Sequence, residues 1–279
     1  MDMKFSLKKW VMSVAAAAAL TVSAMPAMAQ QVDKLDQIRQ SGELRIPVMV
    51  GEEPGYIRDR NTGEWGGFYV EWGKEIAEVL DVKVVPVETT WGNLAADFQA
   101  NRIDIALGLN PNPSRGLVVD YLSVPLFTDA WALVARPDFD ATTWNELNNP
   151  DVRLVVQSGG TMQVVAENLT PNATIVPVAE RPLGVLELQS GRADAMIVAI
   201  FDALQIANQV DVKVIVPEPM LRNPATIGVA RTPNNAGFIN WLTNWVNQQR
   251  ALGLAQAKLR NAFDKAGLDT SVLPANFSF

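Results

Sequence analysis

The sequence contains no cysteine and no histidine. Without cysteine the chain has no disulfides, no thiolate nucleophile and no cysteine to carry a lipid. Without histidine it has no Ser-His-Asp or Cys-His machinery and lacks the usual zinc and copper ligand sets. We therefore expect no cofactor, no resident metal and no catalytic residues, although acid–base chemistry by carboxyl groups stays open.

Basic residues are also outnumbered. Lys and Arg total 23 against 30 Asp and Glu, so the net charge is -7. A nucleic-acid-binding protein needs a basic surface, and none is expected here. The chain has 279 residues with 48% hydrophobic and 19% charged content, which suits one large folded domain or two modest lobes.

The longest apolar run lies near the N-terminus. The lysine-bearing stretch MDMKFSLKKW precedes VMSVAAAAALTVSA, and Ala27 and Ala29 stand at the small-residue positions of a cleavage site before Gln30. This three-part pattern predicts a secretory signal peptide over residues 1–29. The apolar run is short for a membrane helix and no stop-transfer charges follow it. We therefore expect a periplasmic protein.

After Gln30, short apolar strands alternate with amphipathic helices. The expected strands cover residues 44–50, 82–87, 103–109, 152–157, 173–178 and 194–199. The expected helices cover residues 70–80, 93–100, 161–169 and a segment through Leu186–Leu188. This alternation predicts parallel sheets built from β-α-β units, and so an α/β fold.

Two pairs of similar segments, which we call the internal echo, indicate two lobes. FQANRIDIA (98–106) and LQSGRADAM (188–196) carry Gln, Arg and Asp at matching positions, and WALVARPDF (131–139) and TIGVARTPN (226–234) share an extended V-A-R segment. We expect two similar α/β lobes with a hinge of two crossing segments, a hinged clamp whose cleft is a natural ligand site. The expected bounds are 30–134 for lobe 1, 135–228 for lobe 2, and 229–279 for the return to lobe 1 with the C-terminal helices.

Several segments, in this order and spacing, resemble the periplasmic solute-binding proteins of ABC transporters, family 3, the type that carries polar amino acids. They are GELRI (42–46), GGFYVEWGKEIAEVL (66–80), TTWGNLAADFQANRIDIA (89–106), NPSR (112–115), YLSVPLF (121–127), QSGGT (157–161) and LQSGRADAM (188–196). The resemblance covers roughly residues 35–265 and implies a type II periplasmic binding fold. It implies a monomeric receptor that closes on a small carboxylate-bearing solute, such as an amino acid, and delivers it to an ABC permease in the inner membrane.

The resemblance also implies a carboxylate site. Arg115 in NPSR occupies the position at which the family clamps the ligand carboxylate, and a guanidinium binds a carboxylate bidentately. Free N–H groups around Asn110 and Asn112 can assist. Gly160 and Thr161 open a helix whose N-terminus can complete the site. From the residues alone, Arg115 is equally a solvated surface arginine, and the Gly–Thr pair an ordinary N-cap.

Trp91 and Tyr56 stand where the family sandwiches the ligand between aromatic rings. The alternative for Trp91, which precedes a helix, is a core or staple residue. The alternative for Tyr56, in the segment EEPGY, is an unremarkable surface tyrosine.

The chain departs from the family at the ligand's ammonium site. Ala199 stands where the amino-acid binders carry an aspartate, and Tyr69 stands where the family expects an acidic residue. A desolvated ammonium without a counter-charge is costly. Asp202 can substitute, Glu52 or Glu53 can substitute from the first lobe, or the ligand carries no α-ammonium.

Two alternatives to a transport receptor remain. The cyclohexadienyl dehydratases share this fold, and TTWGNLAADF, NRIDIA and GGTMQVVAENL resemble them. Asp202 falls where those enzymes carry a glutamate acid, although it is also explained as a helix acid favoured by the helix dipole. The other alternative is a binding protein that docks on a sensory receptor. We expect a binding protein rather than an enzyme.

Overall fold

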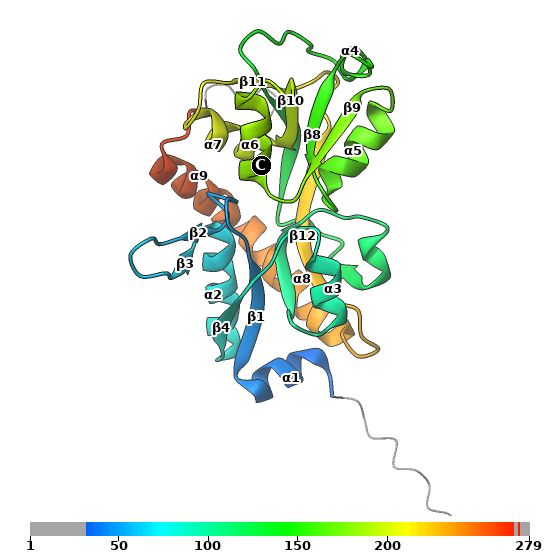
Figure 1. Cartoon of the computed structure of the whole chain (residues 1–279). Coiled ribbons are helices and arrows are strands. Elements are labelled where there is room, and N and C mark those ends of the chain that lie inside the picture. The colour runs from blue at the N-terminus through cyan, green and yellow to red at the C-terminus, as the bar shows by residue number, and fades with distance from the viewer. Residues whose placement is uncertain (1–31, 271–272, 274–279) are drawn as a thin grey trace, which may run out of the picture. The chain divides into compact units, whose positions relative to one another are not determined.

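Strands and helices alternate along the described residues, 32–270 and 273, of the computed structural model (Figure 1). The first half contains α1 (Lys34–Ser41), β1 (Glu43–Val48), β2 (Ile57–Arg58), β3 (Trp65–Gly66), α2 (Phe68–Leu80), β4 (Lys83–Glu88), α3 (Leu94–Gln99), β5 (Ile105–Leu109), η1 (Arg115–Leu117), β6 (Val119–Tyr121) and β7 (Phe127–Ala135). The second half contains α4 (Trp144–Leu147), β8 (Arg153–Gln157), α5 (Thr161–Leu169), β9 (Thr174–Val178), α6 (Arg181–Gln189), β10 (Ala195–Ala199), α7 (Ile200–Ala207), β11 (Lys213–Ile215), β12 (Arg222–Ala230), α8 (Ala236–Ala251) and α9 (Leu254–Ala266).

The predicted α/β fold class is confirmed, and the predicted helices and strands are present. Their ends differ from the predicted ends by no more than two residues, and the helix through Leu186–Leu188 is α6. The signal peptide predicted over residues 1–29 lies outside the described residues. Within the described part, no helix combines the length and apolar character needed to cross a membrane.

The strands form a mixed sheet rather than wholly parallel ones. β1 and β4 pair in parallel, and β8 runs parallel to both β9 and β10. An eight-stranded sheet has the order β5-β12-β7-β10-β8-β9, with β6 and β11 at its sides. In this sheet β7 and β12 are antiparallel to their neighbours, because they carry the chain from one lobe to the other and back. The prediction of parallel sheets is therefore wrong for the crossing strands.

Two lobes are joined by these crossing strands. We call the half built on β1, β4 and β5 the first lobe, and the half built on β8, β9 and β10 the second lobe. β7 pairs with β12 through Phe127–Ala130 and Arg222–Ala225. Beyond this ladder β7 pairs with β10 in the second lobe, and β12 pairs with β5 in the first. We place the hinge at this ladder, a few residues before the segments predicted from the sequence.

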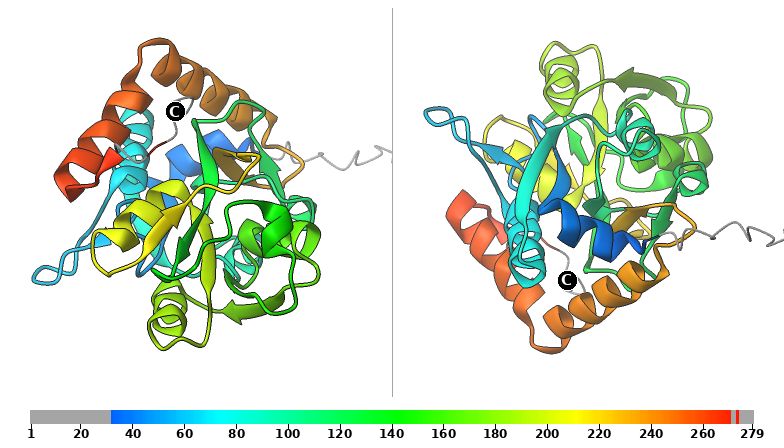
Figure 2. Two further views of the ribbon diagram at one scale, coloured as in Figure 1. Left: turned by 90° about the horizontal axis from the view of Figure 1, so that it is seen from above. Right: turned by 90° about the horizontal axis from the view of Figure 1, so that it is seen from below.

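The C-terminal helices pack on the first lobe. α8 contacts α1 and α9 contacts α2, as the two views of Figure 2 show. Phe238, Leu242 and Val246 of α8, with Leu259 and Phe263 of α9, are buried in the larger hydrophobic cluster. The smaller cluster lies in the second lobe and contains alternate residues of its strands. The strands of the second lobe are therefore covered on both faces.

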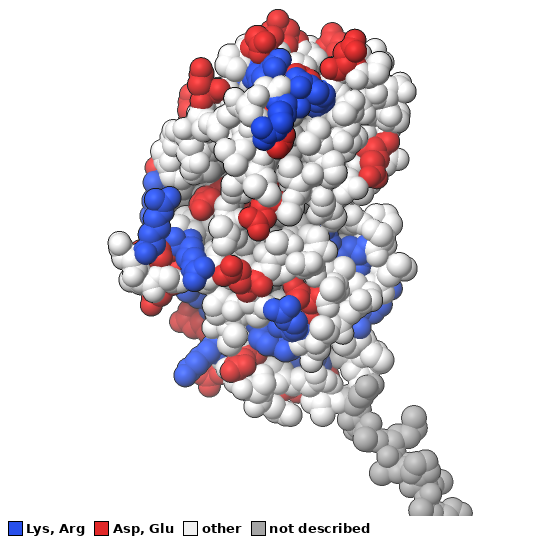
Figure 3. Space-filling model, in the orientation of Figure 1, with Lys and Arg blue, Asp and Glu red and all other residues white. Residues whose placement is uncertain are grey.

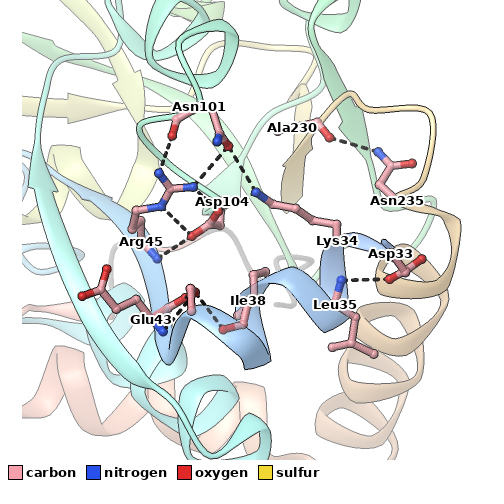
Figure 4. A network of polar contacts seen from close by, with 11 residues as sticks. Asp33, Lys34, Leu35, Ile38, Glu43, Arg45, Asn101, Asp104, Ala230 and Asn235 are labelled. Carbon is pink, nitrogen blue, oxygen red and sulfur yellow. Dashed lines mark hydrogen bonds and ion pairs between the residues drawn. The ribbon is translucent and has the colours of Figure 1, made fainter. Parts of the chain in front are cut away.

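The aspartates of the internal echo, Asp104 and Asp194, each form the same kind of ion pair with an arginine of the first strand of their lobe. In the first lobe, Asp104 Oδ2 accepts hydrogen bonds from Arg45 N and Nε at 2.8 and 3.0 Å, and Oδ1 pairs with Nη2 at 2.6 Å (Figure 4). In the second lobe, Asp194 binds Arg153 through the same atoms at the same distances. Each aspartate precedes a central strand and fastens it to the first strand of its lobe.

The two ion pairs differ in burial. Asp104 is 2% exposed and also binds Lys34 Nζ from α1 at 2.7 Å. Asp194 is 10% exposed, and its second cation, Arg136, lies at 3.3 Å. The pair in the first lobe is therefore the more costly one to break.

Asp104→Asn should lower the free energy of unfolding by about 3 kcal/mol, because it leaves Arg45 and Lys34 without a full counter-charge. Asp194→Asn should cost about 1–2 kcal/mol, because its more exposed partners regain water. Urea denaturation of both variants measures the difference. An equal loss in the two variants would show that burial does not set the strength of the repeated pair.

Candidate functional site

Both lobes and the hinge contribute to one small cavity of about 40 Å³. Its lining residues are Glu52, Tyr69, Trp91, Gly108, Asn110, Arg115, Phe127, Asp129, Trp131, Gly160, Thr161, Met162, Ala199, Asp202, Asn223 and Ala225. Most residues predicted from the sequence are among them; Tyr56 and Asn112 are not. A cavity of this size holds only a few water molecules, so the lobes are closed on one another.

Arg115 is buried at this cavity without a carboxylate partner. Arg115 lies in the loop after β5 and is 5% exposed. Its Nη2 donates a hydrogen bond to Gly159 O in the second lobe at 2.9 Å. Within residues 32–270 and 273, no Asp or Glu forms an ion pair with it. Burial lowers the pKa of Arg115, although the nearby Tyr121 acts in the opposite direction. A buried guanidinium without a counter-charge is costly, so this group is suited to receive an anion.

Asn112 orders the arginine loop from inside. Its Oδ1 accepts hydrogen bonds from Ser114 N at 3.0 Å, Ser114 Oγ at 2.7 Å and Arg115 N at 3.3 Å. The residue is 6% exposed and does not line the cavity. The structure thus gives Asn112 a role in shaping the loop. Asn110 does line the cavity, and its Nδ2 donates to Pro224 O at 3.0 Å.

Gly92 in the first lobe and Gly159 in the second lobe let the loops of the two lobes meet beside Arg115. Gly159 has a φ of 72°, and a Cβ there would lie 2.8 Å from the Cα of Gly92. Gly160 is the N-cap of α5, and Thr161 is its first residue. Gly160 and Thr161 both line the cavity, so the N-terminus of this nine-residue helix faces the space next to Arg115.

Tyr69 lies where the sequence led us to expect Tyr56. Tyr56 is 1% exposed, and its ring packs behind Tyr69 with the ring centroids 5.1 Å apart. The ring of Tyr69 passes over two glycines, because a Cβ on Gly108 or Gly55 would lie only 2.1 or 2.5 Å from it. Gly108, the glycine in IDIALGL, was the feature of the sequence that could have indicated this arrangement, because a glycine there leaves space for a large side chain.

Arg181 joins two carboxylates that line the cavity, although it does not line the cavity itself. Its Nη2 forms ion pairs with Glu52 Oε2 from the first lobe and with Asp202 Oδ1 at 2.8 Å. Gln157 Nε2 donates to Glu52 Oε1 at 2.7 Å. Gly51 permits this contact, since a Cβ there would lie 2.7 Å from Pro182. Arg181 could not be identified from the sequence, because a charged residue at a helix start is usually solvated.

Two carboxyl groups in the cavity have raised pKa values. Burial raises the pKa of Asp202 to about 7 and Glu52 adds to the shift, whereas Arg181 opposes it. Burial raises the pKa of Asp129 well above its usual range, although Ala130 N donates to its Oδ1 at 2.7 Å. Asp129 lies in the hinge ladder opposite Asn223, and both line the cavity. An acidic residue inside the apolar segment FTDAWALVA was the signal for Asp129 in the sequence.

A larger groove of about 820 Å³ lies elsewhere, between α2 and α9. Its rim carries Glu71, Glu75, Lys258 and Lys265, and Glu75 pairs with Lys258. On the face that Figure 3 shows, acidic and basic side chains likewise lie beside one another. Among the described residues that line the groove, no buried charged side chain lacks a partner, so the cavity between the lobes is the better candidate for the functional site.

The model of one protein family matches most of the chain. It describes the bacterial extracellular solute-binding proteins, family 3, and it matches residues 44–266. The fold is accordingly of the type II periplasmic binding kind.

Two curated relatives and one solved structure are similar to the chain. A cyclohexadienyl dehydratase of Pseudomonas aeruginosa is 26% identical over 251 residues, which are 89% of this chain and 92% of the relative. The "probable amino-acid ABC transporter periplasmic-binding protein y4tE" of Sinorhizobium fredii is 26% identical over 72% of this chain and 67% of the relative. The ancestral amino acid-binding protein AncCDT-1, described as a precursor of cyclohexadienyl dehydratase, is 28% identical with a TM-score of 0.74, and the match covers 83% of this chain and 100% of that one.

The raised pKa of Asp202 predicts a pH-dependent stability. A carboxyl whose pKa is higher in the folded state stabilises the fold at low pH, and this contribution is lost as the pH rises through about 7. Asp202→Asn has no such loss. The variant should therefore gain stability relative to the wild type between about pH 4 and pH 8, by a few kcal/mol. Thermal unfolding of both proteins across this range measures the difference, and a constant difference would contradict the prediction.

Proposed function

The chain belongs to the bacterial extracellular solute-binding proteins, family 3, and on this basis we propose that it binds an amino acid or a related small carboxylate between its lobes for an ABC importer. The observation that carries the proposal is Arg115, buried at the cavity without a carboxylate partner among the residues described. A ligand carboxylate supplies the missing counter-charge through a bidentate pair.

The surrounding groups suit the rest of such a ligand. The N-terminus of α5, with Gly160 and Thr161, offers N–H groups to the same carboxylate. Trp91 and Tyr69 pack against the ligand body, and Asn110 supplies an amide at its edge. Because the ligand contacts both lobes, its binding favours the closed form. The named relatives, a transporter binding protein and an ancestral amino acid-binding protein, support this ligand class.

The same proposal includes the route of the ligand. A signal peptide over residues 1–29 exports the chain to the periplasm. There, the first and second lobes close about the β7–β12 ladder as a monomeric clamp, which docks on the permease in the inner membrane. Cell fractionation, together with the mass of the mature chain, tests export and cleavage.

A thermal-shift screen of amino acids, keto acids and aromatic acids identifies the ligand class. A true ligand at 100 times its dissociation constant should add roughly 2.7 kcal/mol to the free energy of unfolding. If no carboxylate-bearing compound shifts the transition, the proposed function is wrong.

Arg115→Ala should weaken binding of the ligand found in that screen by about 30-fold to 1,000-fold, because a buried charge pair is lost. Arg250→Ala is the control, since Arg250 is exposed on α8 and donates to Pro125 O away from the cavity. Isothermal titration calorimetry measures both variants. Equal affinities in Arg115→Ala and the control would exclude Arg115 as the carboxylate clamp.

A second function is favoured by one observation: Asp202 lies in the cavity with its pKa raised to about 7. Such a carboxyl can protonate a leaving hydroxyl, as a dehydratase requires. The similarity to the cyclohexadienyl dehydratase of Pseudomonas aeruginosa points the same way. Incubation with prephenate, with phenylpyruvate as the measured product, tests it. If this function holds, turnover falls as the pH rises through about 7 and is lost in Asp202→Asn. Saturable binding of prephenate without turnover would exclude it.

A further inference from the structure

Arg181 places a fixed positive charge directly behind Glu52 and Asp202, two carboxylates of the cavity that an amino acid's ammonium would need as counter-charges. The residue begins α6 and is 4% exposed. Its guanidinium contacts Glu52, Asp202 and the carbonyl oxygen of Glu53 at 3.2 Å. No sequence motif singled it out, and the proposed function does not use it.

The two carboxylates beside Arg181 are already engaged. Both oxygens of Glu52 have partners, Gln157 Nε2 on one and Arg181 on the other. Oδ1 of Asp202 pairs with Arg181, and the backbone N–H of Ala199 also bonds this carboxylate. An incoming ammonium would meet carboxylates that are neutralised already, and a guanidinium of its own sign behind them.

The third carboxyl group of the cavity, Asp129, forms no ion pair with any cation in the described part of the chain, and burial raises its pKa well above the usual range. In the neutral form it donates a hydrogen bond. An oxygen on the ligand accepts this bond, whereas an ammonium has no lone pair to accept it. Asn223, opposite Asp129 in the hinge ladder, adds an amide that bonds an oxygen equally well.

We propose that Arg181 determines the specificity of the site, so that it selects small carboxylic acids with an oxygen at the 2-position over amino acids of the same skeleton. This rests on the proposed function, since Arg115 still holds the ligand carboxylate. Arg181 does for Glu52 and Asp202 what a ligand ammonium does in an amino-acid site. The ligand class is therefore 2-oxo and 2-hydroxy acids.

The test compares matched pairs, such as pyruvate with L-alanine and phenylpyruvate with L-phenylalanine, by isothermal titration calorimetry. The wild type should bind the oxo acid of a pair at least about tenfold more tightly. Arg181→Gln frees two carboxylates and should shift the preference at least about tenfold toward the amino acid. Arg192→Gln is the control, because Arg192 pairs with Glu187 on the surface of the same lobe.

The variant with both Glu52→Gln and Arg181→Gln guards against misfolding of the single variant. It removes both charges of the interlobe pair and leaves Asp202 for the ammonium, so it should shift the preference in the same direction. A wild type that prefers the amino acid overturns the inference and leaves the proposed function standing, as does an unchanged preference in the Arg181 variants. If no acid of either kind binds, the proposed function itself fails.

Discussion

Burial of two guanidinium groups, one lining the cavity and the other behind two of its carboxylates, is the constraint on which the site depends. Arg115 has lost its water and has no carboxylate beside it among the described residues, whereas Arg181 has two. The cost of burying a cation explains both arrangements, because the charge is met either by the protein or by a ligand. The positive charge of Arg115 is thus unpaired within the described residues, whereas that of Arg181 is neutralised by Glu52 and Asp202. In the proposed function, this asymmetry orients the ligand with its carboxylate toward Arg115.

A different use of the same chemistry holds each lobe together. The Arg45–Asp104 and Arg153–Asp194 pairs fasten a central strand to the first strand of its lobe. These pairs do not line the cavity, although they use the residue types that form the site. Their equal geometry in the two lobes explains why FQANRIDIA and LQSGRADAM carry an aspartate at matching positions. The echo reflects a structural requirement of the β-α-β unit rather than a shared ligand contact.

The sequence predicted what depends on neighbours along the chain. Apolar periodicity placed the helices and strands, and the strand-to-loop transition with its prolines drew attention to Arg115. The sequence did not predict features that depend on contacts between distant segments. Tyr56 looked like a wall of the site, but the glycines at 55 and 108 admit Tyr69 instead. The role of Arg181 could not be predicted, because it depends on an ion pair with Glu52, which is distant in the sequence and lies in the other lobe. Asp129 could have been noticed as a lone acid in an apolar strand.

The hinge ladder itself forms the floor of the cavity, through Asp129 and Asn223. When two lobes rotate about a hinge, the residues at the hinge move least. When the lobes part, the bonds from Arg115 to Gly159 and from Arg181 to Glu52 must break, while the floor keeps its shape. In the proposed closure, the open form therefore presents Asp129 and Asn223 to an incoming solute in the same arrangement as the closed form.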